Sequence, residues 1–202
     1  MFDATKTQQA LNTVANAGLV VDGKLGPATM VALLTRVTGT GRPKLATVLA
    51  PEIVSRLAAH EIDTPLRLRQ LLAQACCETA RFNTLVEYGD DAYFLRYEGR
   101  RDLGNVKAGD GPRFRGRGLL QTTGRANYTT LAEVTGLDCV NHPELLADPA
   151  NAVEAAVRFW SAHNLNRLAD AADTKGVTRV INGGLNGLVD RLTFFERLGV
   201  LQ

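Results

Sequence analysis

Apolar residues recur at helical spacing along most of the chain. The clearest run follows Asp63-Thr64-Pro65, where six side chains fall at i, i+3, i+4, i+7, i+8 and i+11: Leu68, Leu71, Leu72, Ala75, Cys76 and Thr79. This spacing predicts one buried helix face, with Thr64 as the cap and Pro65 as the first helical residue. A similar face follows Asp148-Pro149, and two more helices are predicted from Asp173 to Asn182 and over 188–198. The pattern therefore predicts a mainly α-helical protein.

The first 38 residues predict a smaller unit of two short helices around a turn. Helical spacing around Leu11 indicates the first helix, Asp22-Gly23 is a turn signal, and Pro27 opens the second helix. Residues 39–43 predict a linker, so that residues 44–202 form the main domain.

Residues 88–120 lack any helical period and are rich in tyrosine, glycine and arginine. They predict loops with a short hairpin. Residues 96–125 hold eight basic and three acidic residues, a local excess of five. Such a segment is typical either of an RNA-binding tail or of an ordered loop layer whose glycines take positive φ. A single Arg-Gly-Arg-Gly unit favours the loop layer, and no nucleic-acid partner is expected.

Composition narrows the classes of protein further. The chain has 202 residues, of which 45% are hydrophobic and 22% charged, and its net charge is +2. These values predict a globular protein without membrane insertion and argue against a general polyanion binder. The three cysteines predict free thiols in a reducing cytoplasm, and the start of the chain does not predict a signal peptide. The three histidines, His60, His142 and His163, form no metal-binding pattern, so no metal and no cofactor are predicted.

Two carboxylates are candidates for acid–base chemistry. Glu78 is expected at the edge of the apolar face of its helix, near the C-terminal end, where partial burial and the helix dipole favour the protonated form. Glu87 follows nine residues later among polar neighbours and is expected to be more solvated and ionised. Two carboxylates in unlike surroundings are typical of glycoside hydrolysis.

The segment from Phe114 to Tyr128 combines glycines and arginines with groups suited to sugar hydroxyls. Gln121 and Asn127 offer donors and acceptors, Thr123 offers a hydroxyl, and Tyr128 offers a flat face.

With these motifs in order, the chain from about 43 to 201 resembles the catalytic domain of glycoside hydrolase family 19, above all its phage and prophage endolysins. The matching stretches are 72–79, 103–105 with 109–111, 115–128, and 181–187 with Arg191. Residues 5–36 similarly resemble a peptidoglycan-binding module, through Gln-x-x-Leu-Asn and the later Val-Asp-Gly-x-x-Gly-Pro-x-Thr.

The family resemblance implies a lysozyme-like α-helical domain with a small hairpin or loop lobe, and a cleft between the lobe and the helices. It also implies an inverting mechanism and a role for each matching residue. Glu78 would be the general acid, Glu87 the general base, and Thr123 a holder of the attacking water. Gln121, Asn127 and Asn182 would bind sugar, and Arg191 would position or pair with the acid. The chain departs from the family at Cys77, where a histidine is common, and at Phe114, where a tyrosine is common.

The sequence is therefore interpreted as a monomeric endolysin that cleaves β-1,4 bonds of bacterial peptidoglycan as a muramidase. It would accumulate in the cytoplasm of the infected bacterium and reach the wall through a separate membrane-hole protein. The basic segment 96–125 would assist the approach to anionic wall polymers. Two alternatives stay open: a chitinase, and a wall-binding protein without activity.

Overall fold

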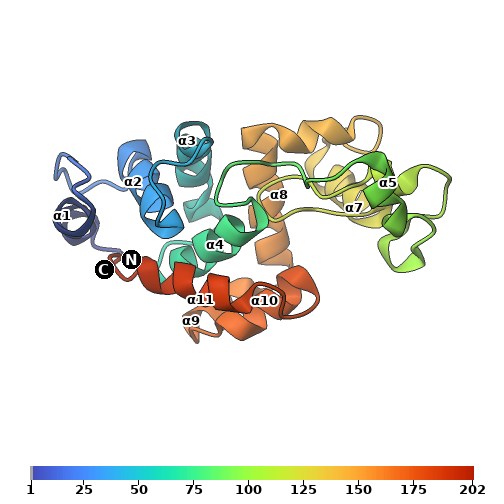
Figure 1. The fold of residues 1–202 in the computed structure, drawn as a ribbon. Helices are drawn as coiled ribbons and strands as arrows, with labels where there is room; N and C mark the ends of the chain where they lie inside the picture. The colour runs from blue at the N-terminus through green and yellow to red at the C-terminus, as the bar shows by residue number, and fades with distance from the viewer. Residues whose placement is uncertain (1) are drawn as a thin grey trace.

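The computed structural model describes residues 2–202, and helices account for nearly all of its regular structure (Figure 1). The α-helices are α1 Ala4–Ala15, α2 Pro27–Thr38, α3 Ala46–Arg56, α4 Pro65–Glu78, α5 Asp91–Phe94, α6 Asp110–Arg113, α7 Arg125–Thr135, α8 Pro149–Ala162, α9 Leu165–Asp170, α10 Thr174–Asn182 and α11 Leu188–Arg197. Short 3-10 helices are η1 Ala58–His60, η2 Leu95–Tyr97, η3 Arg101–Leu103 and η4 Pro143–Ala147. The predicted mainly α-helical class is confirmed.

Helix α4 lies at the centre of the helical body, in contact with α2, α9, α10 and α11. Its predicted inner face is buried from Leu68 to Thr79. The Thr64 hydroxyl accepts a hydrogen bond from the backbone N–H of Arg67, and Pro65 occupies the first turn. Glu78, the last residue of α4, is therefore held at the end of a helix that is packed on several sides.

The N-terminal segment shares the core of this body. Leu11 of α1 and Leu33 of α2 are fully buried in the same apolar cluster as α4 and α11. The Gln8 side chain donates to Asp22 and accepts from the N–H groups of Asp22 and Gly23, so it holds the turn between α1 and α2. The apolar core therefore does not divide at residues 39–43, and a separate role for residues 1–38 stays a prediction.

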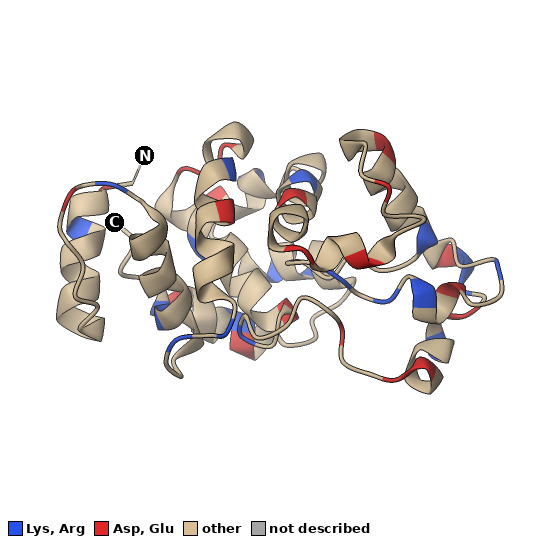
Figure 2. Ribbon diagram, turned by 90° about the horizontal axis from the view of Figure 1, so that it is seen from above, with Lys and Arg blue, Asp and Glu red and all other residues tan. Residues whose placement is uncertain are grey.

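Residues 87–123 form a lobe beside the body, around α5 in Figure 1. The expected hairpin is reduced to two isolated antiparallel bridges, from Val86 to Arg117 and from Arg117 to Thr122. Basic and acidic residues are interspersed over the lobe in Figure 2. Three of its arginines pair with carboxylates: Arg96 with Glu87, Arg100 with Asp102, and Arg115 with Asp91. The basic segment is thus an ordered loop layer, in which much of the positive charge is locally compensated.

The buried aspartate of the lobe pairs with the helix that follows it. Asp110 is 1% exposed and receives two hydrogen bonds from the Arg125 guanidinium at the start of α7, one of them from Nε at 2.9 Å. These bonds, and a further one from the backbone N–H of Lys107, hold the pKa of the Asp110 carboxyl below its usual range. Asn105, which is fully buried, links the Tyr97 carbonyl to the N–H of Arg125. Polar contacts therefore fix the lobe on the body.

Two further features complete the fold. Cys76 and Cys139 are buried and Cys77 is partly exposed, and all three are free thiols. Over residues 2–202, no helix combines the length and the apolar character needed to cross a membrane.

Candidate active site

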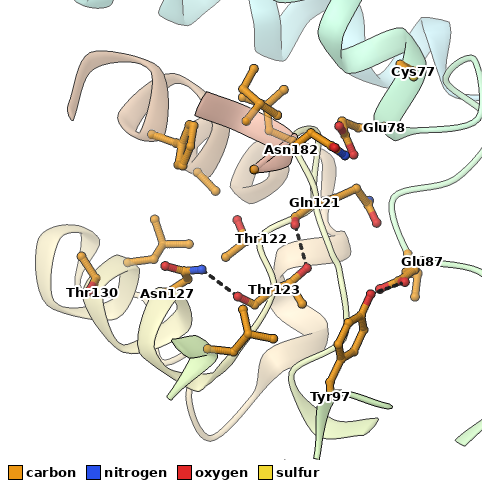
Figure 3. A pocket seen from close by; sticks show the side chains of 18 of the residues that line it. Cys77, Glu78, Glu87, Tyr97, Gln121, Thr122, Thr123, Asn127, Thr130 and Asn182 are labelled. Atoms are coloured by element: carbon orange, nitrogen blue, oxygen red, sulfur yellow. Dashed lines mark hydrogen bonds between the residues drawn. The ribbon is translucent and has the colours of Figure 1, made fainter. Parts of the chain in front are cut away.

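A cleft of about 840 Å³ separates the lobe from the helices. On one side it is lined by residues of the lobe, including Tyr93, Tyr97 and Arg100, and on the other by residues of α4, α7, α8 and α10. Glu78, Glu87, Gln121, Thr123, Asn127 and Asn182, each predicted from the sequence as a site residue, line this cleft. Figure 3 shows Glu78 and Glu87 on opposite sides of the Gln121 side chain.

Glu78 ends α4 and is held by one buried arginine. Its Oε1 lies 2.5 Å from Nη2 of Arg191, a residue of α11 that is only 2% exposed. The same guanidinium donates from Nη1 to Gln74 Oε1 and from Nε to the Asn186 carbonyl. Gln74 precedes Glu78 by one helical turn, so α4 offers both acceptors to the same arginine. Sequence reasoning missed Gln74, although its i, i+4 spacing from Glu78 could have indicated it.

Glu87 is held by donors from the lobe. Its Oε1 accepts from the Tyr97 hydroxyl at 2.8 Å and from Arg96 at 3.3 Å, and its Oε2 accepts from the N–H of Gly116 at 3.0 Å. The Glu87 N–H in turn donates to the Gly116 carbonyl at 2.9 Å. Tyr97 and Arg96 were also missed, because they lie in an aperiodic segment whose neighbours in space cannot be read from spacing.

The two carboxylates differ less in exposure than the sequence suggested. The Glu78 side chain is 15% exposed and that of Glu87 20%. Their difference lies in their partners: Glu78 faces a single buried guanidinium, whereas Glu87 faces a phenol, a half-exposed arginine and a backbone N–H.

Gln121 and Thr123 lie on the turn that closes the bridge to Arg117. Gln121 has a left-handed backbone with φ of 54°, and its amide nitrogen donates to the Gly118 carbonyl at 2.9 Å. The Thr123 hydroxyl donates to the Gln121 carbonyl at 2.9 Å. Both side chains are therefore held by bonds within the turn.

Asn127 and Asn182 lie at the exposed edges of the cleft. The Asn127 amide donates to the Thr123 carbonyl at 2.7 Å, and Asn182, at the end of α10, lines the same cleft as Glu78. Tyr128, in contrast, is fully buried and its hydroxyl bonds to the Arg115 carbonyl and to Arg117. Its ring packs on Phe114, away from the cleft, and this corrects the expectation of a sugar-facing surface.

Cys77 lines the cleft beside Glu78, and burial raises the pKa of its thiol. Its Sγ lies so close to Gly187 that a Cβ there would approach it to 2.8 Å. The thiol is thus a neutral packing group at this position.

Part of the cleft lining is apolar. Val134 of α7, Phe159 of α8 and Ile181 of α10 contribute to it, and the Phe159 ring stacks on His163 with 4.0 Å between ring centroids.

No family model matches the chain. It is similar to a glycosyl hydrolase family 19 domain-containing protein of Haemophilus influenzae, at 39% identity over 52% of this chain and 50% of that protein. It is also similar to chitinase 8 of Oryza sativa subsp. japonica, at 29% identity over 43% of each chain. The chain thus spans about half the length of the curated relatives it matches.

The fold is similar to that of chitinase C from Streptomyces griseus HUT6037. The two structures superpose with a TM-score of 0.66 over 88% of this chain and 95% of that chain, at 21% sequence identity. The lysozyme-like helical architecture expected from the sequence is therefore confirmed.

Proposed function

We propose that the protein is an inverting glycoside hydrolase that cleaves β-1,4 bonds of bacterial peptidoglycan, and that it acts as a phage endolysin of the muramidase type. The observation that carries the proposal is the pair Glu78 and Glu87, which face one cleft and are each held by a separate set of donors. Similarity to a family 19 glycosyl hydrolase domain protein supports the reaction class.

In this mechanism Glu78 gives its proton to the leaving glycosidic oxygen. Arg191, buried and 2.5 Å from Glu78, stabilises the carboxylate that remains. Glu87 takes a proton from water, which attacks the anomeric carbon from the opposite face of the sugar. Tyr97 and the Gly116 N–H keep the Glu87 carboxylate oriented during this step. Gln121, Asn127 and Asn182 supply the polar groups that bind sugar hydroxyl and acetamido groups.

The choice of peptidoglycan rests on the resemblance of residues 5–36 to a wall-binding module. In such a module the loop 18–25, which Gln8 and Asn12 hold through their side chains, would face the wall. An endolysin of this kind would accumulate in the cytoplasm of the infected bacterium as a monomer and reach the wall through a separate membrane-hole protein.

A chitinase is the second candidate, because chitinase 8 and chitinase C are similar to this chain in sequence and in fold, respectively. The cleft residues fit an N-acetylglucosamine polymer as well as a glycan that alternates with N-acetylmuramic acid.

The test is mass spectrometry of borohydride-reduced products from purified peptidoglycan and from chitin, with wild type and Glu78→Gln. Products that end in reduced muramic acid, absent with the variant, support the muramidase. Products that end in reduced glucosamine, or cleavage of chitin alone, support the chitinase. Binding to walls without release of any product, where a lysozyme control digests the same substrate, contradicts both and favours a wall-binding protein. Cleavage by Glu78→Gln at the wild-type rate contradicts the assignment of the acid.

A further inference from the structure

Three side-chain oxygens of the cleft converge beside the backbone of Gly116. A Cβ at this residue would lie 2.8 Å from Gln121 Oε1, 2.9 Å from Glu87 Oε2 and 3.2 Å from Thr123 Oγ1. The backbone does not demand glycine here, because Gly116 lies outside the left-handed region. Glycine is therefore required here by the lack of room for a side chain. The space that a side chain would fill adjoins all three oxygens.

Each of these oxygens is available only as an acceptor. The Thr123 hydroxyl spends its hydrogen on the Gln121 carbonyl, and the Gln121 amide nitrogen donates to the Gly118 carbonyl, which leaves Oε1 facing Gly116. Glu87, when ionised, has no hydrogen to give. A water molecule beside these three oxygens donates its two hydrogens to two of them at a time, and its lone pairs then point away from them.

We propose that Gly116 is a positioning residue that keeps open the place of the attacking water, with Gln121 Oε1 as its third acceptor. This inference rests on the proposed function. In the reaction the water oxygen forms a bond to the anomeric carbon while the bond from that carbon to the leaving oxygen breaks. One water proton passes to Glu87, and the leaving oxygen takes the proton of Glu78. A methyl group at residue 116 displaces the water and pushes against Gln121 Oε1 and Glu87 Oε2, while Asn127 and Asn182 stay in place.

The test is Gly116→Ala, measured for kcat, KM, binding to purified peptidoglycan by co-sedimentation, and thermal unfolding. We expect kcat to fall roughly a hundredfold or more, the scale of a lost general-base step, with KM and binding within about twofold of wild type. Gly199→Ala is the matched control, because Gly199 is also outside the left-handed region and does not line the cleft, and a Cβ there would likewise crowd an oxygen, the Glu196 carbonyl at 3.2 Å. Its kcat should equal that of wild type.

Several outcomes overturn the proposal. A wild-type kcat for Gly116→Ala does so, and so does a fall in kcat that is matched by equal losses of binding and melting temperature, because that result indicates general disruption. If Gly116→Ala does not fold, Gln121→Met decides: it keeps the length of the side chain and removes the third acceptor, and an unchanged kcat contradicts the proposal. Wild-type protein inactive on both peptidoglycan and chitin overturns the proposed function and this inference together, whereas active wild type with active Gly116→Ala overturns this inference alone.

Discussion

The helical body and the lobe each hold one carboxylate of the cleft, by different physical means. In the body, Glu78 stands at the end of a helix packed on several sides, and one buried arginine fixes it. In the lobe, Glu87 lies on irregular backbone and is fixed by a phenol, an arginine and a backbone N–H. Burial of apolar side chains in the body places Glu78. Hydrogen-bonded polar groups of the lobe, such as Asp110 and Asn105, place Glu87. A site can thus be built across two regions whose stabilities have different origins.

The largest effect is expected from the body, with Arg191→Ala. This change leaves the Glu78 carboxylate without its charged partner and Gln74 Oε1 without a donor in a buried place. Breaking such a buried pair costs on the order of 3 kcal/mol in the free energy of unfolding. Chemical denaturation should show this loss together with a loss of hydrolysis. Arg179→Ala, on an exposed part of α10, is the control and should unfold within about 0.5 kcal/mol of wild type. An Arg191→Ala protein as stable as this control would show that the pair does not hold the body together.

The matching change in the lobe is Arg125→Ala, which leaves Asp110 buried and unpaired. The loss in stability is of the same order, about 3 kcal/mol at most. Much of it should appear as local opening of residues 87–123, because the lobe can open while the core of the body stays folded. Amide hydrogen exchange should therefore rise in the lobe while α4 stays protected, and hydrolysis should fall. Uniform loss of protection in both regions would contradict the division into two regions. Arg101→Ala, at an exposed arginine of the lobe, is the control.

Low pH should destabilise the lobe through the pair of Asp110 and Arg125. The pKa of Asp110 is lowered in the folded protein from the ordinary 3.8, so its contribution to stability is fully present above pH 3.8. It is lost progressively as the pH falls below that value toward the folded-state pKa. Hydrogen exchange in the lobe should rise below pH 3.8 in wild type, and this acid-dependent part should be missing in Arg125→Ala.

A smaller change, and a gain in stability instead of a loss, is expected at the turn that joins the body and the lobe. Ala80, Arg81 and Phe82 all have left-handed backbones, with φ of 48°, 63° and 58°. The turn is held by the Thr79 hydroxyl, which accepts from the N–H of Phe82, and by the burial of the Phe82 ring. A left-handed residue other than glycine costs about 1–2 kcal/mol, so Arg81→Gly should raise the free energy of unfolding by up to about 1 kcal/mol. The same change inside a regular helix, Arg179→Gly, should lower it by about 1 kcal/mol. If both variants change the free energy of unfolding in the same direction, the backbone at residue 81 is not strained.

The two regions also differ in how far the sequence predicts them. Helical spacing predicted the inner face of α4 and the place of Glu78 at its edge, because packing there follows local periodicity. The pairing of Arg191 with Glu78 was expected only from the family resemblance. Tyr128 was wrongly placed in the site because neighbouring helical residues point about 100° apart, so Asn127 faces the cleft while Tyr128 faces the core. The partners of Glu87 come from other segments of the lobe, and Gln121 has a left-handed backbone, and neither feature leaves a periodic signal. The turn at 80–82 is equally hidden, since its residue types rarely adopt that conformation.

The smallest effect concerns the charge of the lobe. Arg101 and Lys107 are exposed, whereas Arg96, Arg100 and Arg115 pair with carboxylates of the lobe. Only charges that are not compensated nearby can attract anionic wall polymers at a distance, and salt screens that attraction over about 10 Å at 0.1 M. Arg101→Glu combined with Lys107→Glu should therefore slow the lysis of anionic walls a few-fold at low salt and leave it unchanged at high salt. The matched control is Arg167→Glu with Lys175→Glu on exposed positions of the helical body, which changes the net charge equally. If both double variants change the salt dependence of lysis equally, net charge controls the approach to the wall and the lobe has no special part in it.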